Sequence, residues 1–204
     1  LTYKAKDGQT YLLNLIDTPG HVDFSYEVSK ALAACEGALL LVDAAQGVQA
    51  QTLANLYLAL EHKLTVIPVI NKIDLSNAEP EKVKKQILSI LKIKEEDIIF
   101  ASAKEGIGSE EILERVIRDI PPPIGEVENP LQALIFDSAF DIYKGVVIYL
   151  RLFNGRIHKE MEIKLMSNNH NYQVQEIGIF SPRMVDIDTL SSGEVGFITA
   201  NIRN

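Results

Sequence analysis

The stretch 38–74, ALLLVDAAQGVQAQTLANLYLALEHKLTVIPVINKID, determines the class of fold. Apolar runs cover 38–43 and 65–71, and between them apolar side chains recur three and four residues apart, at Leu53, Leu56, Tyr57 and Leu60. Such spacing is typical of one face of a helix, whereas short apolar runs are typical of buried strands. The stretch therefore predicts a strand, a helix and a parallel strand, the repeating unit of an α/β fold.

The same alternation extends to both sides of this stretch. Apolar runs at 11–16 and 97–102 predict two further strands, and apolar stripes predict helices near 28–35, 83–91 and 112–120. Strands that alternate with helices predict a doubly wound parallel sheet, which binds ligands at the carboxyl ends of its strands. Polar residues follow the predicted strands at these ends: Asp17, Asp43, Asn71 and Ser102. Their position predicts a binding site.

The pattern changes after the proline-rich segment IPPPIGEVENP at 120–130. From Leu131 onward the sequence consists of short strand-like runs separated by turn residues, including Asn154-Gly155, and it predicts a small antiparallel barrel. We therefore expect an α/β domain at 1–122, a linker at 123–130 and a β-barrel domain at 131–204 that lacks its last strand.

Composition excludes several classes of protein. The chain has 204 residues, of which 47% are hydrophobic and 24% charged, a balance typical of a globular core. The net charge of −8 argues against a general binder of nucleic-acid backbones, although it leaves room for a local basic face. A single cysteine excludes an internal disulfide, and the four histidines lack metal-ligand spacing.

The sequence NKID at Asn71–Asp74 directly follows a predicted strand. A carboxylate fixed there can accept two parallel hydrogen bonds from the N1–H and the exocyclic amine of guanine, an edge that adenine does not offer. Asn71 can connect neighbouring loops, and the alkyl stem of Lys72 can cover the face of the base. The sequence SAK at Ser102–Lys104 closes another strand and offers a backbone N–H to the carbonyl oxygen of the base. The alternatives are an Asx turn for Asn71 and Asp74 and solvated surface charges for the two lysines.

The motifs DTPGH at 17–21, NKID and SAK occur in this order, each after a predicted strand. Together they resemble the translation-factor class of GTPases, in which the first belongs to switch II and the others recognise guanine. Longer segments, such as DTPGHVDFSYEVSKALAACEGALLLVDAAQGVQAQTLAN and FDSAFDIYKGVVIYLRLFNG, resemble the elongation factor 4 (LepA) family. The likeness covers essentially the whole chain.

The resemblance implies a role for each motif residue. Asp17 would hold Mg²⁺ through a water, the Gly20 amide would contact the γ-phosphate of GTP, and His21 would orient the attacking water. The implied contacts to the guanine base come from Asn71, Lys72, Asp74, Ser102, Ala103 and Lys104. The alternatives are a strand-ending cap for Asp17 and an ordinary turn histidine for His21.

The chain departs from the family in one essential motif. It contains no G-x-x-x-x-G-K-[ST], the loop whose backbone amides and lysine hold the phosphates, and no switch I threonine. The first strand of the sheet, which precedes this loop in the family, is missing as well. In the sheet it would lie between the strands predicted at 11–16 and 38–43. We therefore expect an internal fragment of a longer GTPase that does not hydrolyse GTP by itself.

The resemblance implies a ribosome-dependent GTPase as the parent protein, in the bacterial cytoplasm or an organelle. Its implied partners are guanine nucleotides and the ribosome, both ribosomal RNA and proteins; peripheral membrane association stays open and DNA has no role. The alternative is a non-catalytic module that binds the ribosome or RNA and has lost its phosphate-binding loop. A signature in the barrel, Asp137, Asp141, Tyr143, Lys144 and Gly145, either contacts ribosomal RNA or shapes a hairpin.

Overall fold

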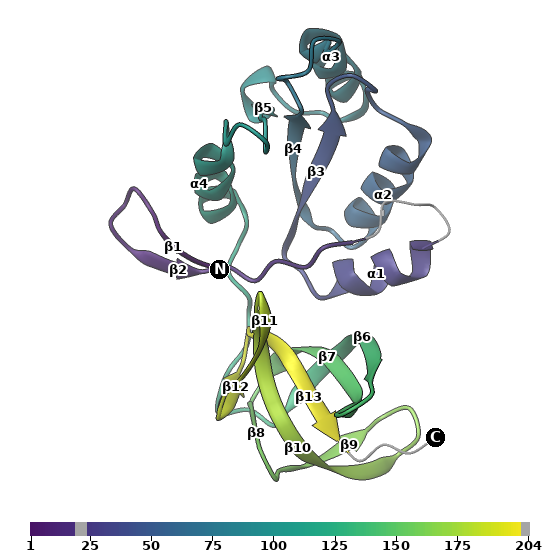
Figure 1. Cartoon of the computed structure of the whole chain (residues 1–204), viewed down its shortest axis with the longest axis vertical. Helices are drawn as coiled ribbons and strands as arrows, with labels where there is room; N and C mark the ends of the chain where they lie inside the picture. The colour runs from purple at the N-terminus through teal and green to yellow at the C-terminus, as the bar shows by residue number, and fades with distance from the viewer. Residues whose placement is uncertain (19–23, 201–204) are drawn as a thin grey trace. The chain divides into compact units, whose positions relative to one another are not determined.

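The chain forms an α/β unit followed by an antiparallel β unit (Figure 1). The structure is a computed structural model that describes residues 1–18 and 24–200. One unit spans Thr2–Pro121, and the other begins at Pro122 and includes Leu1. This organisation agrees with the fold class that the sequence predicts.

A three-stranded parallel sheet lies at the centre of the α/β unit, in the order β3-β4-β5. The strands are β3 (Gly37–Asp43), β4 (Thr65–Asn71) and β5 (Ile99–Phe100). Asp43 pairs with Asn71 at the carboxyl ends of β3 and β4. The register therefore places these two polar residues side by side at one edge of the sheet.

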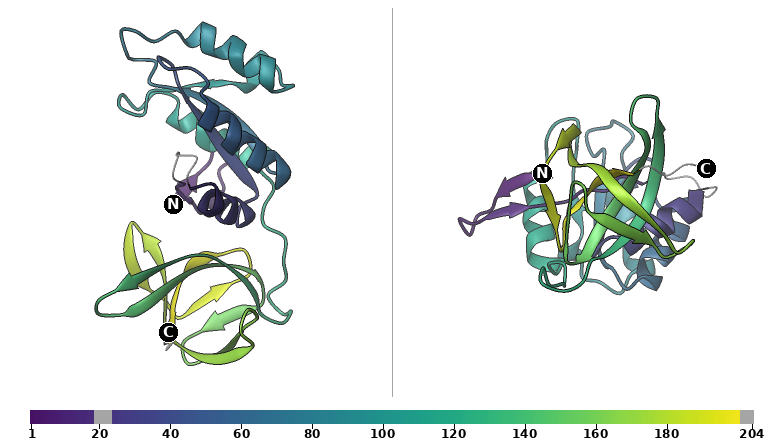
Figure 2. Two further views of the ribbon diagram at one scale, coloured as in Figure 1. Left: turned by 90° about the vertical axis from the view of Figure 1, so that its right-hand side faces the viewer. Right: turned by 90° about the horizontal axis from the view of Figure 1, so that it is seen from below.

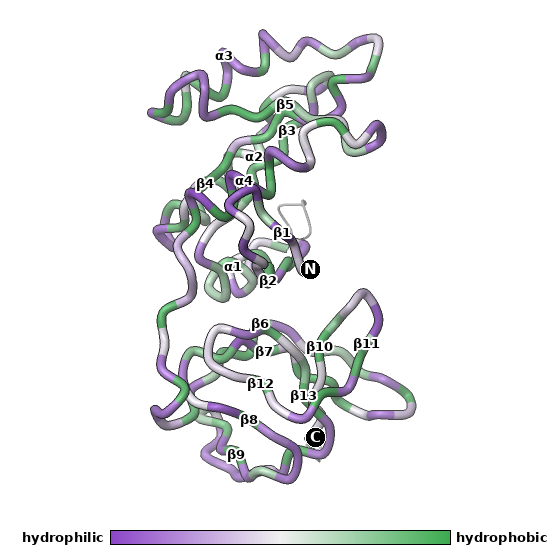
Figure 3. Tube along the Cα trace, turned by 90° about the vertical axis from the view of Figure 1, so that its left-hand side faces the viewer, coloured by the Kyte–Doolittle hydropathy of each residue, from purple (hydrophilic) through white to green (hydrophobic). Residues whose placement is uncertain are grey.

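Helices cover both faces of this sheet (Figures 1 and 2). Alternate residues of β4 face opposite sides, since Ile70 packs with the core under α2 and α3, whereas Ile67 and Val69 pack with α4. The strands are correspondingly apolar along their length, as the green segments of Figure 3 show. The helices are α1 (Ser25–Ala33), α2 (Ala50–Glu61), α3 (Pro80–Ile90) and α4 (Ser109–Asp119). None of the helices in residues 1–18 and 24–200 combines the length and the apolar character that crossing a membrane takes.

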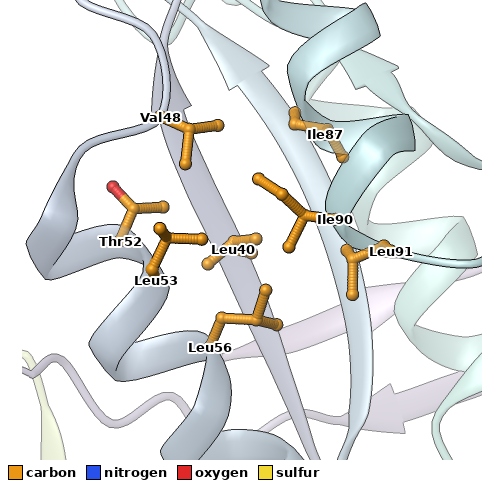
Figure 4. A pocket seen from close by; sticks show the side chains of 8 residues that line it. All are labelled: Leu40, Val48, Thr52, Leu53, Leu56, Ile87, Ile90 and Leu91. Carbon is orange, nitrogen blue, oxygen red and sulfur yellow. The ribbon is translucent and has the colours of Figure 1, made fainter.

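A small apolar pocket lies between α2, α3 and the face of β3 (Figure 4). Its lining is aliphatic except for Thr52, whose hydroxyl accepts a hydrogen bond from the backbone of Gln49 at 3.4 Å. The aliphatic lining residues are Leu40, Val48, Leu53, Leu56, Ile87, Ile90 and Leu91. Without several convergent polar groups such a lining offers a ligand little orientation, so we interpret the pocket as imperfect packing of the core.

Pro68 lies inside β4, which is the central strand of the sheet rather than an edge strand. Pairing between β4 and β5 begins one residue later, at Val69 and Ile99. The missing N–H of Pro68 therefore interrupts no residue pair between β4 and the short β5. Strand β5 covers only two of the residues 97–102 predicted for it, because Glu95–Asp97 forms a 3-10 turn before it. The Arg115 guanidinium holds this turn by donating to Glu96 O at 3.1 Å and to Asp97 Oδ1 at 3.2 Å.

The strand predicted at 11–16 is the main error of the sequence analysis. Only Thr10–Leu12 forms a strand, β2, and it pairs antiparallel with β1 (Thr2–Lys4) in a separate hairpin. The turn is fixed by Gly8 at φ 85° and by the Asp7 carboxylate, which accepts from the Gln9 N–H at 2.8 Å. Residues 13–18 have no secondary structure, and Leu15 is 80% exposed. A strand forms only where a neighbour satisfies its backbone groups, and apolar character alone does not supply that neighbour.

Leu41 is an exposed apolar residue on the outer strand of the parallel sheet. Within the described residues β3 pairs only with β4, and the Leu41 side chain is 58% exposed. An uncovered apolar strand edge promotes association between chains. We expect Leu41→Lys to raise the concentration at which the isolated chain begins to scatter light, and to change the free energy of unfolding by less than about 0.5 kcal/mol.

The neighbouring residue provides the control for this prediction. Leu40 lies on the opposite face of β3 and lines the pocket between α2 and α3. Leu40→Lys would place an unpaired charge there, and we expect it to destabilise the chain by more than about 2 kcal/mol. Equal light scattering by the wild type and the Leu41→Lys variant would contradict an aggregation-prone edge.

The second unit is a curled antiparallel sheet in the order β11-β10-β13-β7-β6, with β9 joined to β10 and a separate β8–β12 pair (Figures 1 and 2). Its core consists of buried apolar side chains, which include the Phe197 ring and the aliphatic Leu150, Leu152, Val174, Leu190 and Ile198. The strands are β6 (Gln132–Asp141), β7 (Gly145–Asn154), β8 (Arg156–His158), β9 (Glu162–Leu165), β10 (His170–Ser181), β11 (Arg183–Asp186), β12 (Thr189–Ser191) and β13 (Val195–Ala200).

Candidate functional site

Asn71 connects the two loops that the sequence assigns to a guanine site. It is the last residue of β4, and its backbone oxygen accepts from the Ala44 N–H at 2.8 Å. Its side-chain Oδ1 accepts from the Ala103 N–H at 3.1 Å, across 32 positions of sequence. The amide therefore fixes the spacing between the NKID turn and the SAK loop.

Asp74 and Ser102 form a second connection between the same loops. The Ser102 hydroxyl is fully buried and donates to Asp74 Oδ1 at 2.6 Å, while the Asp74 side chain lies at the surface. This hydrogen bond holds the pKa of the Asp74 carboxyl below its usual range. The carboxylate is therefore charged at neutral pH and held in place at the carboxyl ends of the strands.

The SAK loop has its own backbone support. Ser102 and Ile107 exchange two backbone hydrogen bonds of 3.0 Å, and the Ser102 hydroxyl accepts from the Glu105 N–H at 3.2 Å. Gly108 follows with φ 80°, and a Cβ at this position would lie 2.6 Å from the Phe100 carbonyl oxygen. The turn requires a glycine because a side chain would collide with backbone atoms that cannot yield.

The two lysines of the motifs differ in their surroundings. Lys72 Nζ lies 2.8 Å from Asp43 Oδ2, whereas Lys104 is 80% exposed and lies 3.6 Å from Glu105. Asp43 also accepts from the Ala45 N–H at 2.8 Å. The sequence analysis counted Asp43 among the polar residues at strand ends without a specific role, and its ion pair with Lys72 connects it to the NKID turn.

Of the DTPGH motif the structure describes Asp17 and Thr18. Asp17 is exposed and lies in the irregular segment 13–18, rather than at the end of a sheet strand as the sequence predicted. Gly20 and His21 lie outside the described residues, so their assigned roles stay predictions. Among the described residues no three His, Cys, Asp or Glu side chains are grouped to hold a metal. The exposed Asp17 carboxylate nevertheless suits Mg²⁺, which is often bound by one or two carboxylates together with waters and phosphate oxygens.

The barrel signature shapes a hairpin between β6 and β7. Asp141 Oδ1 accepts from the N–H groups of Tyr143 and Lys144 at 2.8 and 2.9 Å, and Gly145 has φ 75°. Lys144 Nζ reaches Glu176 on β10 at 2.8 Å, while Asp137 accepts from the adjacent Ser138 N–H. Tyr143 is 90% exposed, and contact with RNA stays a prediction for it.

Comparison with known proteins identifies the family. The profile of the elongation factor Tu GTP binding domain matches residues 2–122, more than half of the chain. The chain belongs to this family. The match coincides with the α/β unit that carries the connected NKID and SAK loops.

Curated relatives of this family member are similar over its whole length. It is 59% identical over 204 residues to elongation factor 4 of Desulfitobacterium hafniense, and 56% identical to that of Desulforudis audaxviator, with all of the chain and 34% of each relative covered. Elongation factor 4 of Synechocystis is 56% identical over 203 residues. The chain thus spans about a third of the length of these relatives.

A solved structure supports the fold in both units. The translation elongation factor SelB from Methanococcus maripaludis, crystallised with the GTP analogue GPPNHP, matches with a TM-score of 0.73. The match covers 90% of this chain and 42% of SelB at 22% sequence identity. At that identity the likeness shows the α/β and β fold alone.

Proposed function

We propose that the protein carrying this chain is a ribosome-dependent translational GTPase of the elongation factor 4 type, acting in the bacterial cytoplasm. The observation that carries the proposal is the double connection between the NKID and SAK loops, Ser102 to Asp74 and Ala103 to Asn71. These contacts hold the charged Asp74 carboxylate and the SAK loop at one edge of the sheet, where an ion pair with Asp43 also holds Lys72. The family match over 2–122 and the elongation factor 4 relatives support the same function.

Each residue has a proposed task in binding guanine nucleotide. Asp74 accepts from the N1–H and the exocyclic amine of the base, and the Lys72 stem covers its face. The Lys104 N–H meets the carbonyl oxygen of the base, because the Ser102 and Ala103 N–H groups already donate to Ile107 O and Asn71 Oδ1. Asn71 keeps the loops in register. A site of this kind discriminates strongly because a base without the matching donors leaves the Asp74 carboxylate unpaired in the complex.

Hydrolysis rests on the switch II residues and on bound Mg²⁺. The metal would supply positive charge to the phosphates, and Asp17 would hold it through a water. The Gly20 amide would contact the γ-phosphate and His21 would orient the attacking water. Residues 1–122 would form part of the GTP-binding domain, 123–130 a linker and 131–204 the second domain, which would contact the ribosome.

The decisive experiment compares GTP hydrolysis by the full-length protein and by the 204-residue chain, each with and without ribosomes. We expect turnover by the full-length protein to rise with ribosomes, and no turnover by the chain above buffer, because it contains no phosphate-binding loop. Turnover by the chain would contradict its predicted inactivity. Ribosome binding by a full-length protein that binds no GTP would favour the non-catalytic module.

A further inference from the structure

Asp43 is a partly buried carboxylate at the end of β3 that no motif explains. It ends β3 beside Asn71, and its side chain is 18% exposed, against 54% for its partner Lys72. Its Oδ1 accepts from the N–H groups of Ala45 and Gln46 at 2.8 and 3.2 Å, and its Oδ2 lies 2.8 Å from Lys72 Nζ. With both oxygens engaged, the carboxylate faces its own protein and is not displayed to a ligand.

Lys72 is held at both ends of its side chain. Its backbone has φ 65°, a left-handed conformation that residues other than glycine adopt infrequently. The turn that follows is closed by Leu75 N–H donating to the Lys72 carbonyl at 3.2 Å, and Ile73 N–H donates to Ala101 O at 3.3 Å. With the backbone fixed by the turn and the ammonium fixed by Asp43, the four-carbon stem has little freedom left.

We propose that Asp43 is a positioning residue for the guanine base, which acts by anchoring the Lys72 ammonium so that the Lys72 stem lies across the base. The inference rests on the proposed guanine site and adds a residue to it. A free lysine would lose rotamer entropy when it covers the base, whereas the anchored one has lost that freedom before the nucleotide arrives. The Lys72 ammonium also lowers the pKa of Asp43, ahead of its backbone donors, so the carboxylate is charged at neutral pH.

A double-mutant cycle in the full-length protein tests this role, with fluorescent GDP as the probe. Asp43→Asn keeps an acceptor for the Ala45 and Gln46 N–H groups but removes the charge that holds Lys72. We expect Asp43→Asn to raise the Kd for GDP about fivefold, and to have no further effect once Lys72→Ala is present. The preference for GDP over XDP should stay as in the wild type, because the Asp74 contacts remain.

A carboxylate near the same loop gives the matched control. Glu79 donates its N–H to Ala44 O at 2.8 Å, while its side chain pairs with exposed Lys82, so Glu79→Gln should leave the Kd unchanged. Independent, multiplicative effects of Asp43→Asn and Lys72→Ala would overturn the proposal, as would an unchanged Kd in Asp43→Asn. If Asp74→Asn also leaves GDP binding unchanged in this assay, the guanine site itself is wrong and the role of Asp43 falls with it.

Discussion

Asp74→Asn in the full-length protein is expected to lower its preference for guanine over xanthine nucleotides by up to about 10⁴-fold. The carboxylate would accept from two donors of guanine, whereas an amide presents one acceptor and one donor. The donor repels the 2-amino group of guanine but matches the 2-carbonyl of xanthine. The expected result is a raised Kd for GDP and a lowered Kd for XDP, measured by competition against fluorescent GDP.

Ser102→Ala separates the placement of Asp74 from its recognition of the base. The variant removes the 2.6 Å hydrogen bond to Asp74 Oδ1 and the acceptor for the Glu105 N–H. We expect GDP binding to weaken by about tenfold, with no gain of XDP binding, because the carboxylate is kept.

An unchanged affinity for GDP in Asp74→Asn would contradict the assignment of the NKID turn.

The charge on Asp74 also fixes the pH range of binding. The Ser102 hydroxyl lowers the pKa of Asp74 from its ordinary value of 3.8. A lowered pKa means that the charged carboxylate contributes fully to the free energy of unfolding above pH 3.8. This contribution is lost only as the pH falls through the lower, folded-state pKa. Guanine binding should therefore depend little on Asp74 protonation near neutral pH.

Phe197→Ala is expected to lower the free energy of unfolding of the β unit by about 3–5 kcal/mol. The Phe197 side chain is fully buried, and its ring lies 5.3 Å from that of Phe180. A Cβ at Gly178 would lie 2.5 Å from this ring, so the ring packs directly on the backbone of β10. Its removal leaves a cavity that the rigid sheet cannot close.

Phe180, whose ring contacts that of Phe197, provides the control. It contacts Tyr149 at 5.2 Å between ring centroids, but its side chain is 44% exposed. Phe180→Ala should therefore cost clearly less, about 1 kcal/mol. Because the chain has no tryptophan, amide hydrogen exchange of peptides from β7 and β13 in denaturant gives the free energy for this unit. Equal losses in the two variants would contradict the assignment of Phe197 to the core.

The sequence by itself determined the order of elements around the site. The apolar runs at 38–43 and 65–71 became β3 and β4, and the stripes between and after them became α2, α3 and α4. Periodicity and strand-end polarity are local properties, so a single chain displays them without its tertiary contacts. The motifs that name the family are local in the same sense.

The tertiary structure decided what depends on partners distant in the sequence. The run at 11–16 is as apolar as a buried strand, yet only Thr10–Leu12 forms one, because β1 is the one strand that pairs with it among residues 1–18 and 24–200. Ser102 meets Asp74 across 28 positions, and Lys72 meets Asp43 across the paired ends of β3 and β4. Hydrogen bonds and ion pairs of this kind depend on the register of the sheet, which brings together residues that no local pattern connects.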